Sequence, residues 1–268
     1  MSRATQLMTD LAEDIAAIAE RFSDHEGMDD SHVAEWLGQF DAEDTPLALR
    51  VLGRTRYYGQ VEIRTMAKQL IDVALEQAKV RGMTRVAFVA AGTPGSGSSI
   101  VIRAAREHLA IRAKPLLDML AVSHLKPNEY DVIVFIDDFS GTGTTLTDWW
   151  ATVESSVEPT NAAVWLGLLV ATKDAVTRVK QFADWVHVID QLPQKANVFA
   201  KGNTQFSSTQ KTRLHTYCQR TGAHREYVSG LGRCGLLLAF KYGCPDNSLP
   251  VLWHPSPTWR PLFQRRGI

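Results

Sequence analysis

The spacing of apolar residues divides the chain into a helical first part and a strand-rich middle part. Within residues 1–82, apolar side chains recur at intervals of three and four positions, which places them on one face of an amphipathic helix. The clearest series is Leu7, Leu11, Ile15, Ile18 and Phe22, and the spacing continues over 47–58 and 63–80. We therefore predict an N-terminal helical region over 1–82, which serves as a cap or as the oligomerisation element of a homo-oligomer.

After residue 83 the apolar residues gather into short uninterrupted runs. These runs cover 86–91, 132–136, 163–170 and 185–189, and segments with helical spacing lie between them. Near-continuous apolar strands that alternate with helices are typical of a parallel sheet with helices on both faces. The sequence thus predicts an α/β core over 83–191.

The pattern is less regular over 192–268, which we treat as a separate C-terminal region. It favours a helix over 207–218 and a strand over 236–240, followed by a segment rich in Pro and Trp.

Composition and charge restrict the classes of molecule that this protein is expected to bind. Lys and Arg total 29 and Asp and Glu total 29, so the formal net charge is zero. This balance argues against a broad basic face for nucleic acid, although a small positive pocket for a phosphorylated ligand remains compatible with it. The three cysteines, Cys218, Cys234 and Cys244, lack the paired spacing of a zinc site, and their odd number suits a reducing cytosol.

The chain also lacks the features of a secretory or membrane segment. Asp10, Glu13 and Asp14 interrupt the stretch where the apolar part of a signal peptide would lie. The most apolar run, 162–170, is far shorter than the roughly 18 residues needed to span a bilayer. We expect a cytoplasmic protein with no membrane contact.

The segment 132–145, VIVFIDDFSGTGTT, is the strongest candidate for ligand chemistry. Its strand delivers Asp137 and Asp138 to the edge of the sheet where ligands bind in open α/β folds. The turn that follows consists of Ser140, Gly141, Thr142, Gly143, Thr144 and Thr145. Glycines let backbone N–H groups approach a phosphate closely, and the start of a helix favours an anion. Two acids beside such a turn suit a ligand that carries a diol or a metal next to a phosphate, as ribose 5-phosphate does.

This segment resembles the motif of type I phosphoribosyltransferases that binds 5-phosphoribosyl-1-pyrophosphate (PRPP). The resemblance implies a type I phosphoribosyltransferase-like α/β fold, here with an N-terminal helical extension and a C-terminal hood. It also implies PRPP as ligand and Mg²⁺ as cofactor. Asp137 and Asp138 would then contact the ribose hydroxyls and organise the metal, and residues 140–145 would hold the 5-phosphate. Purine-salvage members carry an Asp in this turn where this chain has Gly141, so a 6-oxopurine acceptor is not expected.

A second glycine-rich segment, 92–99, lies between a predicted strand and a predicted helix. It resembles the pyrophosphate-binding loop of the same family, which implies that Gly92, Thr93, Gly95 and Ser96 contact the pyrophosphate. It is also close to the phosphate loop of nucleotide triphosphatases, but Ser98 stands where that motif has Lys. A degenerate P-loop NTPase is therefore an alternative. The missing Lys and the second phosphate turn after the acids count against it.

Basic residues lie between the two loops, at Arg112, Lys114, His124 and Lys126. In type I phosphoribosyltransferases a mobile loop in this interval closes over the pyrophosphate. Lys114 and Lys126 are therefore predicted to stabilise the charge of the leaving group. The alternative is a solvated connection with ordinary surface lysines.

The C-terminal region carries a second resemblance. Segments 231–240, 244–254 and 259–263, together with 36–40, are similar to a phosphoribosyltransferase-like group that is associated with bacterial conflict and phage-defence gene clusters. This resemblance implies partner proteins of a defence system. Trp253, Trp259 and Asn247 are candidates for a hood that recognises the acceptor, although packing in a core is favoured for both Trp side chains.

The predicted reaction is the Mg²⁺-dependent displacement of pyrophosphate from C1 of PRPP by a nitrogen nucleophile of an unidentified acceptor. A module that senses PRPP or a nucleotide without turnover, acting with a partner protein, is the alternative of a different class.

Overall fold

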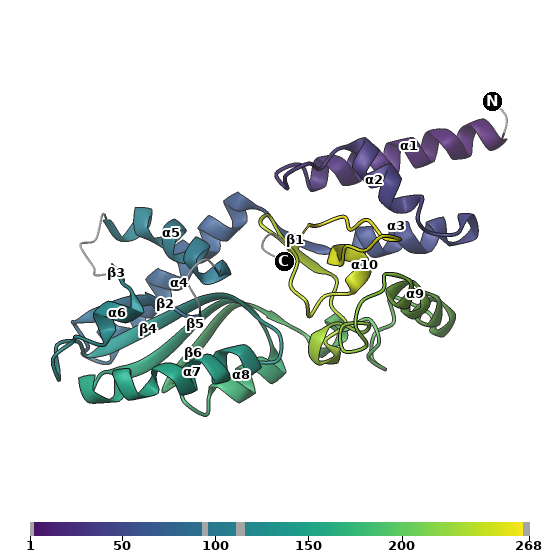
Figure 1. The fold of residues 1–268 in the computed structure, drawn as a ribbon. Helices are drawn as coiled ribbons and strands as arrows, with labels where there is room; N and C mark the ends of the chain where they lie inside the picture. Colours follow the sequence, from purple (N-terminus) through teal and green to yellow (C-terminus); the bar gives the residue numbers. More distant parts are fainter. Residues whose placement is uncertain (1–2, 93–95, 111–115, 265–268) are drawn as a thin grey trace. The chain divides into compact units, whose positions relative to one another are not determined.

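The computed structural model describes residues 3–92, 96–110 and 116–264, and the chain forms two compact units (Figure 1). One unit combines residues 1–60 with residues 194–268, and the other contains residues 61–193. The sequence predicted divisions after residues 82 and 191. The first division lies earlier in the structure because the long helix α4 (Gln60–Val80) covers the sheet of the second unit.

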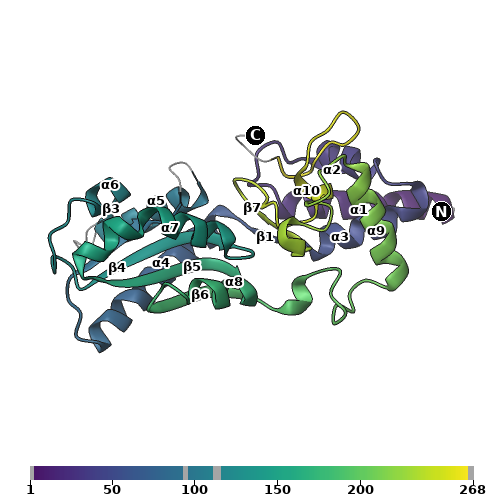
Figure 2. The same cartoon turned by 60° about the horizontal axis from the view of Figure 1, so that its bottom comes forward.

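The second unit is built on a five-stranded parallel sheet. Its strands are β2 (Val86–Ala90), β3 (Leu116–Leu117), β4 (Val132–Ser140), β5 (Ala163–Thr172) and β6 (Trp185–Leu192). Their order across the sheet is β3-β2-β4-β5-β6, and every neighbouring pair is parallel. Figure 2 shows β4, β5 and β6 side by side. The predicted parallel sheet is confirmed, with β4 in its centre.

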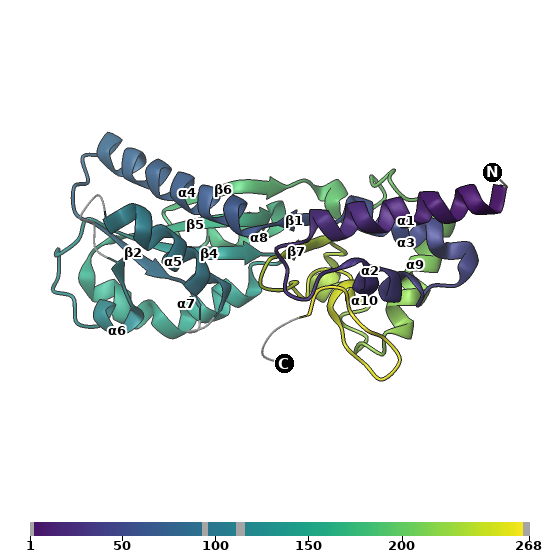
Figure 3. The same cartoon turned by 90° about the horizontal axis from the view of Figure 1, so that it is seen from above.

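Helices cover both faces of this sheet. On one face lie α4 and α5 (Gly97–Ala110), which are side by side in Figure 3 and are joined by a contact of 2.9 Å between His108 Nε2 and Asp72 Oδ1. The side chain of Leu70 packs against Gly167 of β5, where an added Cβ would lie 3.0 Å from it. The other face carries α6 (Met119–Val122), α7 (Thr144–Val157) and α8 (Lys173–Val179), and 3₁₀ turn η2 (Glu158–Thr160) follows α7. The predicted two-sided cover is therefore confirmed.

The central strand is longer than the sequence predicted. Pairing with β5 continues through Asp137, which is opposite Leu168, and through Ser140, which is opposite Ala171. The acid pair thus lies within the paired strand and not beyond its end. The apolar run that marks a strand in the sequence stops at Ile136, whereas the partner strand continues to Thr172 and keeps the pairing intact.

The first unit is assembled from the two ends of the described chain. Its N-terminal elements are α1 (Arg3–Arg21), α2 (Asp30–Leu37), η1 (Ala42–Asp44), α3 (Thr45–Arg54) and β1 (Arg56–Tyr58). Its C-terminal elements are η3 (Gln194–Ala196), α9 (Ser208–Arg220), η4 (Leu231–Arg233), β7 (Leu238–Phe240) and α10 (Pro250–Trp253). The helical spacing over 47–58 was wrong for its last residues, because β1 leaves the helix and pairs in parallel with β7. Among the helices that the structure describes, none is long and apolar enough to cross a membrane.

One apolar core holds these distant segments together. The buried Trp36 indole donates a hydrogen bond of 2.8 Å to the carbonyl of Val251, which joins α2 to α10. Trp253 and Trp259 are also buried in this core, and their indole N–H groups donate to backbone carbonyls at 3.0 Å. Packing, the role favoured from the sequence, is the observed role of both Trp side chains. Asn247 is buried as well and donates from Nδ2 to the carbonyl of Leu231.

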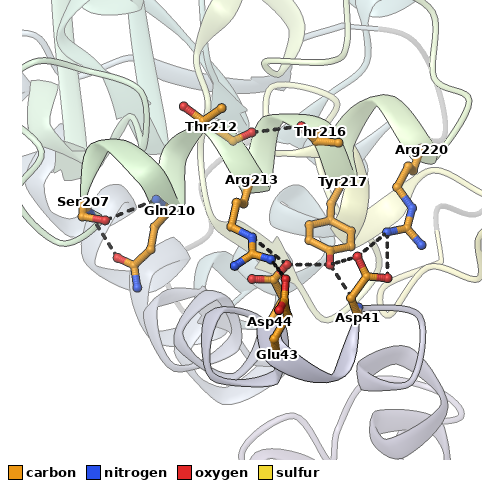
Figure 4. Close-up of polar contacts among 10 residues, drawn as sticks. All are labelled: Asp41, Glu43, Asp44, Ser207, Gln210, Thr212, Arg213, Thr216, Tyr217 and Arg220. Carbon is orange, nitrogen blue, oxygen red and sulfur yellow. Dashed lines mark hydrogen bonds and ion pairs between the residues drawn. The ribbon is translucent and has the colours of Figure 1, made fainter.

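A polar network ties the segment around η1 to α9 (Figure 4). The Tyr217 hydroxyl donates to Asp44 Oδ2 at 2.8 Å and accepts from the Asp41 N–H at 3.0 Å. Arg213 Nε lies 3.0 Å from the same Asp44 carboxylate, and Arg220 pairs with Asp41 at 3.3 Å. Desolvation, the side-chain hydrogen bonds with Asp44 and Asp41 and the charge of Asp44 raise the pKa of Tyr217 to about 12, although the hydrogen bond from the Asp41 N–H acts to lower it. The buried Asp44 carboxylate therefore depends on Tyr217 and Arg213 for its stabilisation.

We expect Tyr217→Phe to lower the free energy of unfolding by about 1–3 kcal/mol, the range for a hydrogen bond to a charged group. Denaturant unfolding checks this value. Tyr227→Phe is the matched control, because the Tyr227 ring packs against Trp253 while no hydrogen bond of its hydroxyl is found in the described part of the chain. Equal stability of the two variants would contradict the importance of this network.

Candidate functional site

The candidate site lies at the carboxyl edge of the sheet in the second unit. Strands β2 and β4 are parallel neighbours, with Ala90 opposite Ile136. The glycine-rich segment 92–99 follows β2 directly, and Asp137 and Asp138 follow Ile136 directly. The segment after β2 and the acid pair of β4 therefore lie next to each other at the same edge of the sheet.

Asp138 and Gly97 are in direct contact. A Cβ atom built on Gly97 would lie only 2.0 Å from Asp138 Oδ2 and 2.2 Å from Asp138 Cγ. The carboxylate thus occupies the space of a missing side chain at the first residue of α5, where the helix dipole favours negative charge. A glycine at this position is what allows the acid pair and the glycine-rich segment to meet.

The two carboxyl groups oppose each other's ionisation. Desolvation, the charge of Asp138 and a side-chain hydrogen bond with Asp138 raise the pKa of Asp137 well above its ordinary value. The N–H of Asp138 donates to Asp137 Oδ1 at 3.0 Å and acts in the opposite direction, favouring the charged form. Both side chains are half-buried. Such a pair is stabilised by a cation or by hydroxyl donors.

The hydroxyl-rich turn has the form of an anion-binding helix start. Gly143 precedes α7 with a φ of 77°, a conformation that favours glycine. Within the described residues, the N–H groups of Thr142, Gly143 and Thr145 have no hydrogen-bond partner. Thr144 and Thr145 are exposed, whereas Ser140 and Gly141 are buried. Free N–H groups and a helix dipole together form a ready site for a phosphate.

The glycine-rich segment is described only in part. Gly92 has a φ of 86°, and the Ser96 and Ser98 hydroxyls lie 2.7 Å apart. Thr93 and Gly95, which were predicted to contact pyrophosphate, lie outside the described residues. Ser98 is fully buried. A buried serine at the position of the P-loop lysine offers no charge to a nucleotide, which argues further against the NTPase alternative.

Of the basic residues between the loops, the two that the structure describes, His124 and Lys126, do not lie at this edge. Lys114 and Arg112 lie outside the described residues. Lys126 and His124 are exposed and precede the start of β4, so they lie toward the amino edge of the sheet. At that edge Asn128 donates to the carbonyl of Thr160, just before β5. Five strand residues, about 16 Å of extended chain, separate this edge from Asp137. Lys126 therefore lies toward the edge opposite the acid pair, and its contact with a leaving group stays a prediction.

Two residues of this site were not predicted from the sequence in their observed roles. Gly97 was predicted only as part of the glycine-rich segment 92–99, and its contact with Asp138 has no sequence signal. Thr172 at the end of β5 donates from Oγ1 to the carbonyl of Gly141 at 2.6 Å. A Thr just before a helix indicates an N-cap, and Thr172 does cap α8, but its reach to the hydroxyl-rich turn depends on the tertiary fold.

The sequence matches the model of one protein family over most of its length. The family model described as PRTase-CE matches residues 33–265. A comparison with curated proteins gave no match.

Solved structures with a similar core include phosphoribosyltransferases. HGPRT-ase from Leishmania tarentolae in complex with GMP is 14% identical with a TM-score of 0.37, covering 51% of this chain and 80% of that chain. The xanthine-guanine-hypoxanthine phosphoribosyltransferase of Helicobacter pylori is 12% identical with a TM-score of 0.34, covering 51% and 90%. A hypothetical protein from Neisseria gonorrhoeae with bound ppGpp is 11% identical with a TM-score of 0.35, covering 52% and 84%. Because these values are low, we draw nothing about ligand or activity from them.

The family match extends over both compact units and over most of the described residues. The chain therefore belongs to the PRTase-CE family, a phosphoribosyltransferase-like family.

Proposed function

We propose that this protein binds PRPP with Mg²⁺ and transfers the phosphoribosyl group to a nitrogen of an acceptor. The observation that carries the proposal is the contact between Asp138 and Gly97. It joins the acid pair of β4 to the glycine-rich segment after β2. With the hydroxyl-rich turn following the same acids, one edge of the sheet offers two anion sites on either side of two carboxylates. PRPP has a matching order of phosphate, ribose diol and pyrophosphate.

The donor set suits Mg²⁺. The described residues contain no group of three or more His, Cys, Asp or Glu that could hold a metal alone. Mg²⁺ in proteins is commonly bound by one or two carboxylates and completed by substrate oxygens and water. Asp137 and Asp138 provide the two carboxylates, and a divalent cation would relieve the repulsion that raises the pKa of Asp137. When bound, the metal would neutralise charge on the pyrophosphate.

The remaining chemistry is positioning by this chain's own groups. The free N–H groups of Thr142, Gly143 and Thr145 would hold the 5-phosphate, and Gly92 and Ser96 would face the pyrophosphate. Transfer breaks the bond from ribose C1 to a pyrophosphate oxygen, which leaves with the electron pair. A bond from C1 to the acceptor nitrogen forms, and that nitrogen loses a proton. Fixed donors around the developing charges lower the barrier without a covalent enzyme intermediate.

The acceptor and the cellular role extend beyond this site. Gly141 stands where purine-salvage enzymes carry an Asp, and its carbonyl is already bonded to Thr172, which supports an acceptor other than a 6-oxopurine. The C-terminal resemblance to a defence-associated group supports a role beside partner proteins of a defence system. A protein that binds PRPP without turnover would be a sensor in that setting.

The acid pair gives the direct test of the proposal. We expect Asp137→Asn with Asp138→Asn to abolish Mg²⁺-dependent PRPP binding in calorimetric titration. The ligand-free variant should be as stable as the parent or slightly more stable at neutral pH, because desolvation and then the charge of Asp138, which raise the pKa of Asp137, disfavour a charged carboxylate that the amide replaces.

The raised pKa of Asp137 also predicts how the stability of the fold changes with pH. A carboxyl group whose pKa is raised by folding stabilises the fold at low pH, and that stability is lost as the pH rises from about 4, the unfolded value, through the folded value. The double variant should lack this loss. Asp148→Asn, which removes an exposed acid of α7, should behave as the parent in both measurements. Unchanged PRPP binding by the double variant would refute the proposed function.

A second prediction concerns the glycine that receives Asp138. Gly97→Ala should displace the Asp138 carboxylate and weaken Mg²⁺-dependent PRPP binding about tenfold or more, while the free energy of unfolding changes by about 1 kcal/mol or less. Gly202→Ala is the control, because an added Cβ there meets no atom within 4 Å. Parent-like affinity of the Gly97 variant would mean that the position of Asp138 does not matter for binding.

A further inference from the structure

The turn between β4 and α7 must keep its carbonyl groups away from a bound anion. A carbonyl oxygen carries partial negative charge, so a loop that binds phosphate through N–H groups has to direct its carbonyls elsewhere. The two glycine carbonyls of this turn are both bonded on the protein side. The carbonyl of Gly143 accepts from the N–H of Thr147 at 3.0 Å, and the carbonyl of Gly141 accepts from Thr172 Oγ1 at 2.6 Å.

The hydrogen bond to the Gly141 carbonyl differs from the one to the Gly143 carbonyl because its donor belongs to a different secondary-structure element. Thr147 belongs to the helix that Gly143 begins, whereas Thr172 ends the neighbouring strand β5. The Thr172 hydroxyl also accepts from the N–H of Ala175 at 3.1 Å, as the N-cap of α8. One hydroxyl thus links the turn to the start of α8.

A second contact supports the turn from the same direction. A Cβ atom on Gly143 would lie 3.0 Å from Arg178 Cβ and 3.1 Å from the carbonyl oxygen of Ala175. The turn therefore rests against α8, while the hydroxyl of Thr172 holds the neighbouring peptide unit.

Because a peptide unit is planar, the hydrogen bond to the Gly141 carbonyl also fixes the direction of the Thr142 N–H. The carbonyl of Gly141 and the N–H of Thr142 belong to one planar trans peptide unit and point in opposite directions. When Thr172 holds the carbonyl, the N–H of Thr142 points away from β5 and α8. This N–H has no partner within the described chain.

We propose that Thr172 is a positioning residue, whose hydroxyl orients the 141–142 peptide so that the Thr142 N–H faces the 5-phosphate of the ligand. This inference rests on the proposed function of the turn as the 5-phosphate site. Thr172 itself touches no ligand and acts through Gly141.

The test compares Thr172→Val, which removes the hydroxyl and keeps the shape, with Thr172→Ser, which keeps the hydroxyl. Titrations use ribose 5-phosphate, which carries only the 5-phosphate, and Mg²⁺-pyrophosphate, which carries only the diphosphate. We expect the Val variant to lose about tenfold in affinity for ribose 5-phosphate, the change for roughly one hydrogen bond. The Ser variant should stay within about twofold of the parent, and pyrophosphate affinity should be the same in all three proteins.

Thr160→Val is the matched control for a lost hydroxyl. Thr160 is buried, donates to the carbonyl of Val157 at 2.7 Å and accepts from the N–H of Ala162 at 3.2 Å, before the start of β5. It should lose stability and keep its affinity for ribose 5-phosphate. Parent-like affinity of the Thr172→Val variant, failure of the Ser variant to restore it, or equal loss for both ligands would overturn the positioning role.

Measurements without ligand separate this inference from the proposed function. In ¹⁵N relaxation of the free protein, the Thr142 and Gly143 amides should be rigid in the parent, with order parameters near about 0.85, and lower in the Val variant. If the parent binds neither PRPP nor ribose 5-phosphate, the proposed function fails, and so does the role of Thr172 toward a ligand. If the parent binds both but the order parameters are equal in parent and variant, only the positioning role of Thr172 is overturned.

Discussion

The parallel pairing of β2 with β4 is the constraint on which the candidate site depends. It places the end of β2 opposite Ile136 of β4, so that the residues after Ala90 and the residues after Ile136 must lie next to each other. Two like charges at Asp137 and Asp138 are then held at the rim of an apolar sheet. Gly97 at the start of α5 leaves space for the Asp138 carboxylate, and the N–H of Asp138 donates to Asp137. The raised pKa of Asp137 shows that its ionisation is still disfavoured.

The helices near this edge of the sheet have different roles. The start of α5 receives the Asp138 carboxylate at Gly97, whereas the N–H groups of Thr142, Gly143 and Thr145 at the start of α7 have no hydrogen-bond partner within the described residues. A third helix, α8, supports the turn through its N-cap Thr172 and through contact with Gly143. Binding groups and supporting groups thus come from different elements. A turn that Thr172 and α8 already hold in one conformation loses less conformational freedom when it binds an anion, and this favours a higher affinity.

Local patterns in the sequence predicted the sheet, its helices and the location of the acid pair, because apolar runs and turn residues are local signals. They did not predict that β4 continues through Ser140, since the length of a strand depends on its partner β5. They also assigned Arg56–Tyr58 to a helix, because the strand partner β7 is far away in the sequence. The joining of the two chain ends into one unit, through Trp36 and Val251, is a similar long-range effect. The sequence also did not indicate that Lys126, which precedes β4, lies toward the amino edge of the sheet, so its contact with a leaving group stays a prediction.

A crystal structure of the protein grown with Mg²⁺ and PRPP would test the account most directly. The account requires electron density for the 5-phosphate at the N–H groups of residues 142–145, with the ribose diol and the metal beside Asp137 and Asp138. The pyrophosphate should then lie toward Gly92 and Ser96. A phosphate chain bound only at the segment after β2, with the turn before α7 empty at saturating PRPP, would contradict the account and favour a nucleotide triphosphatase-like site instead.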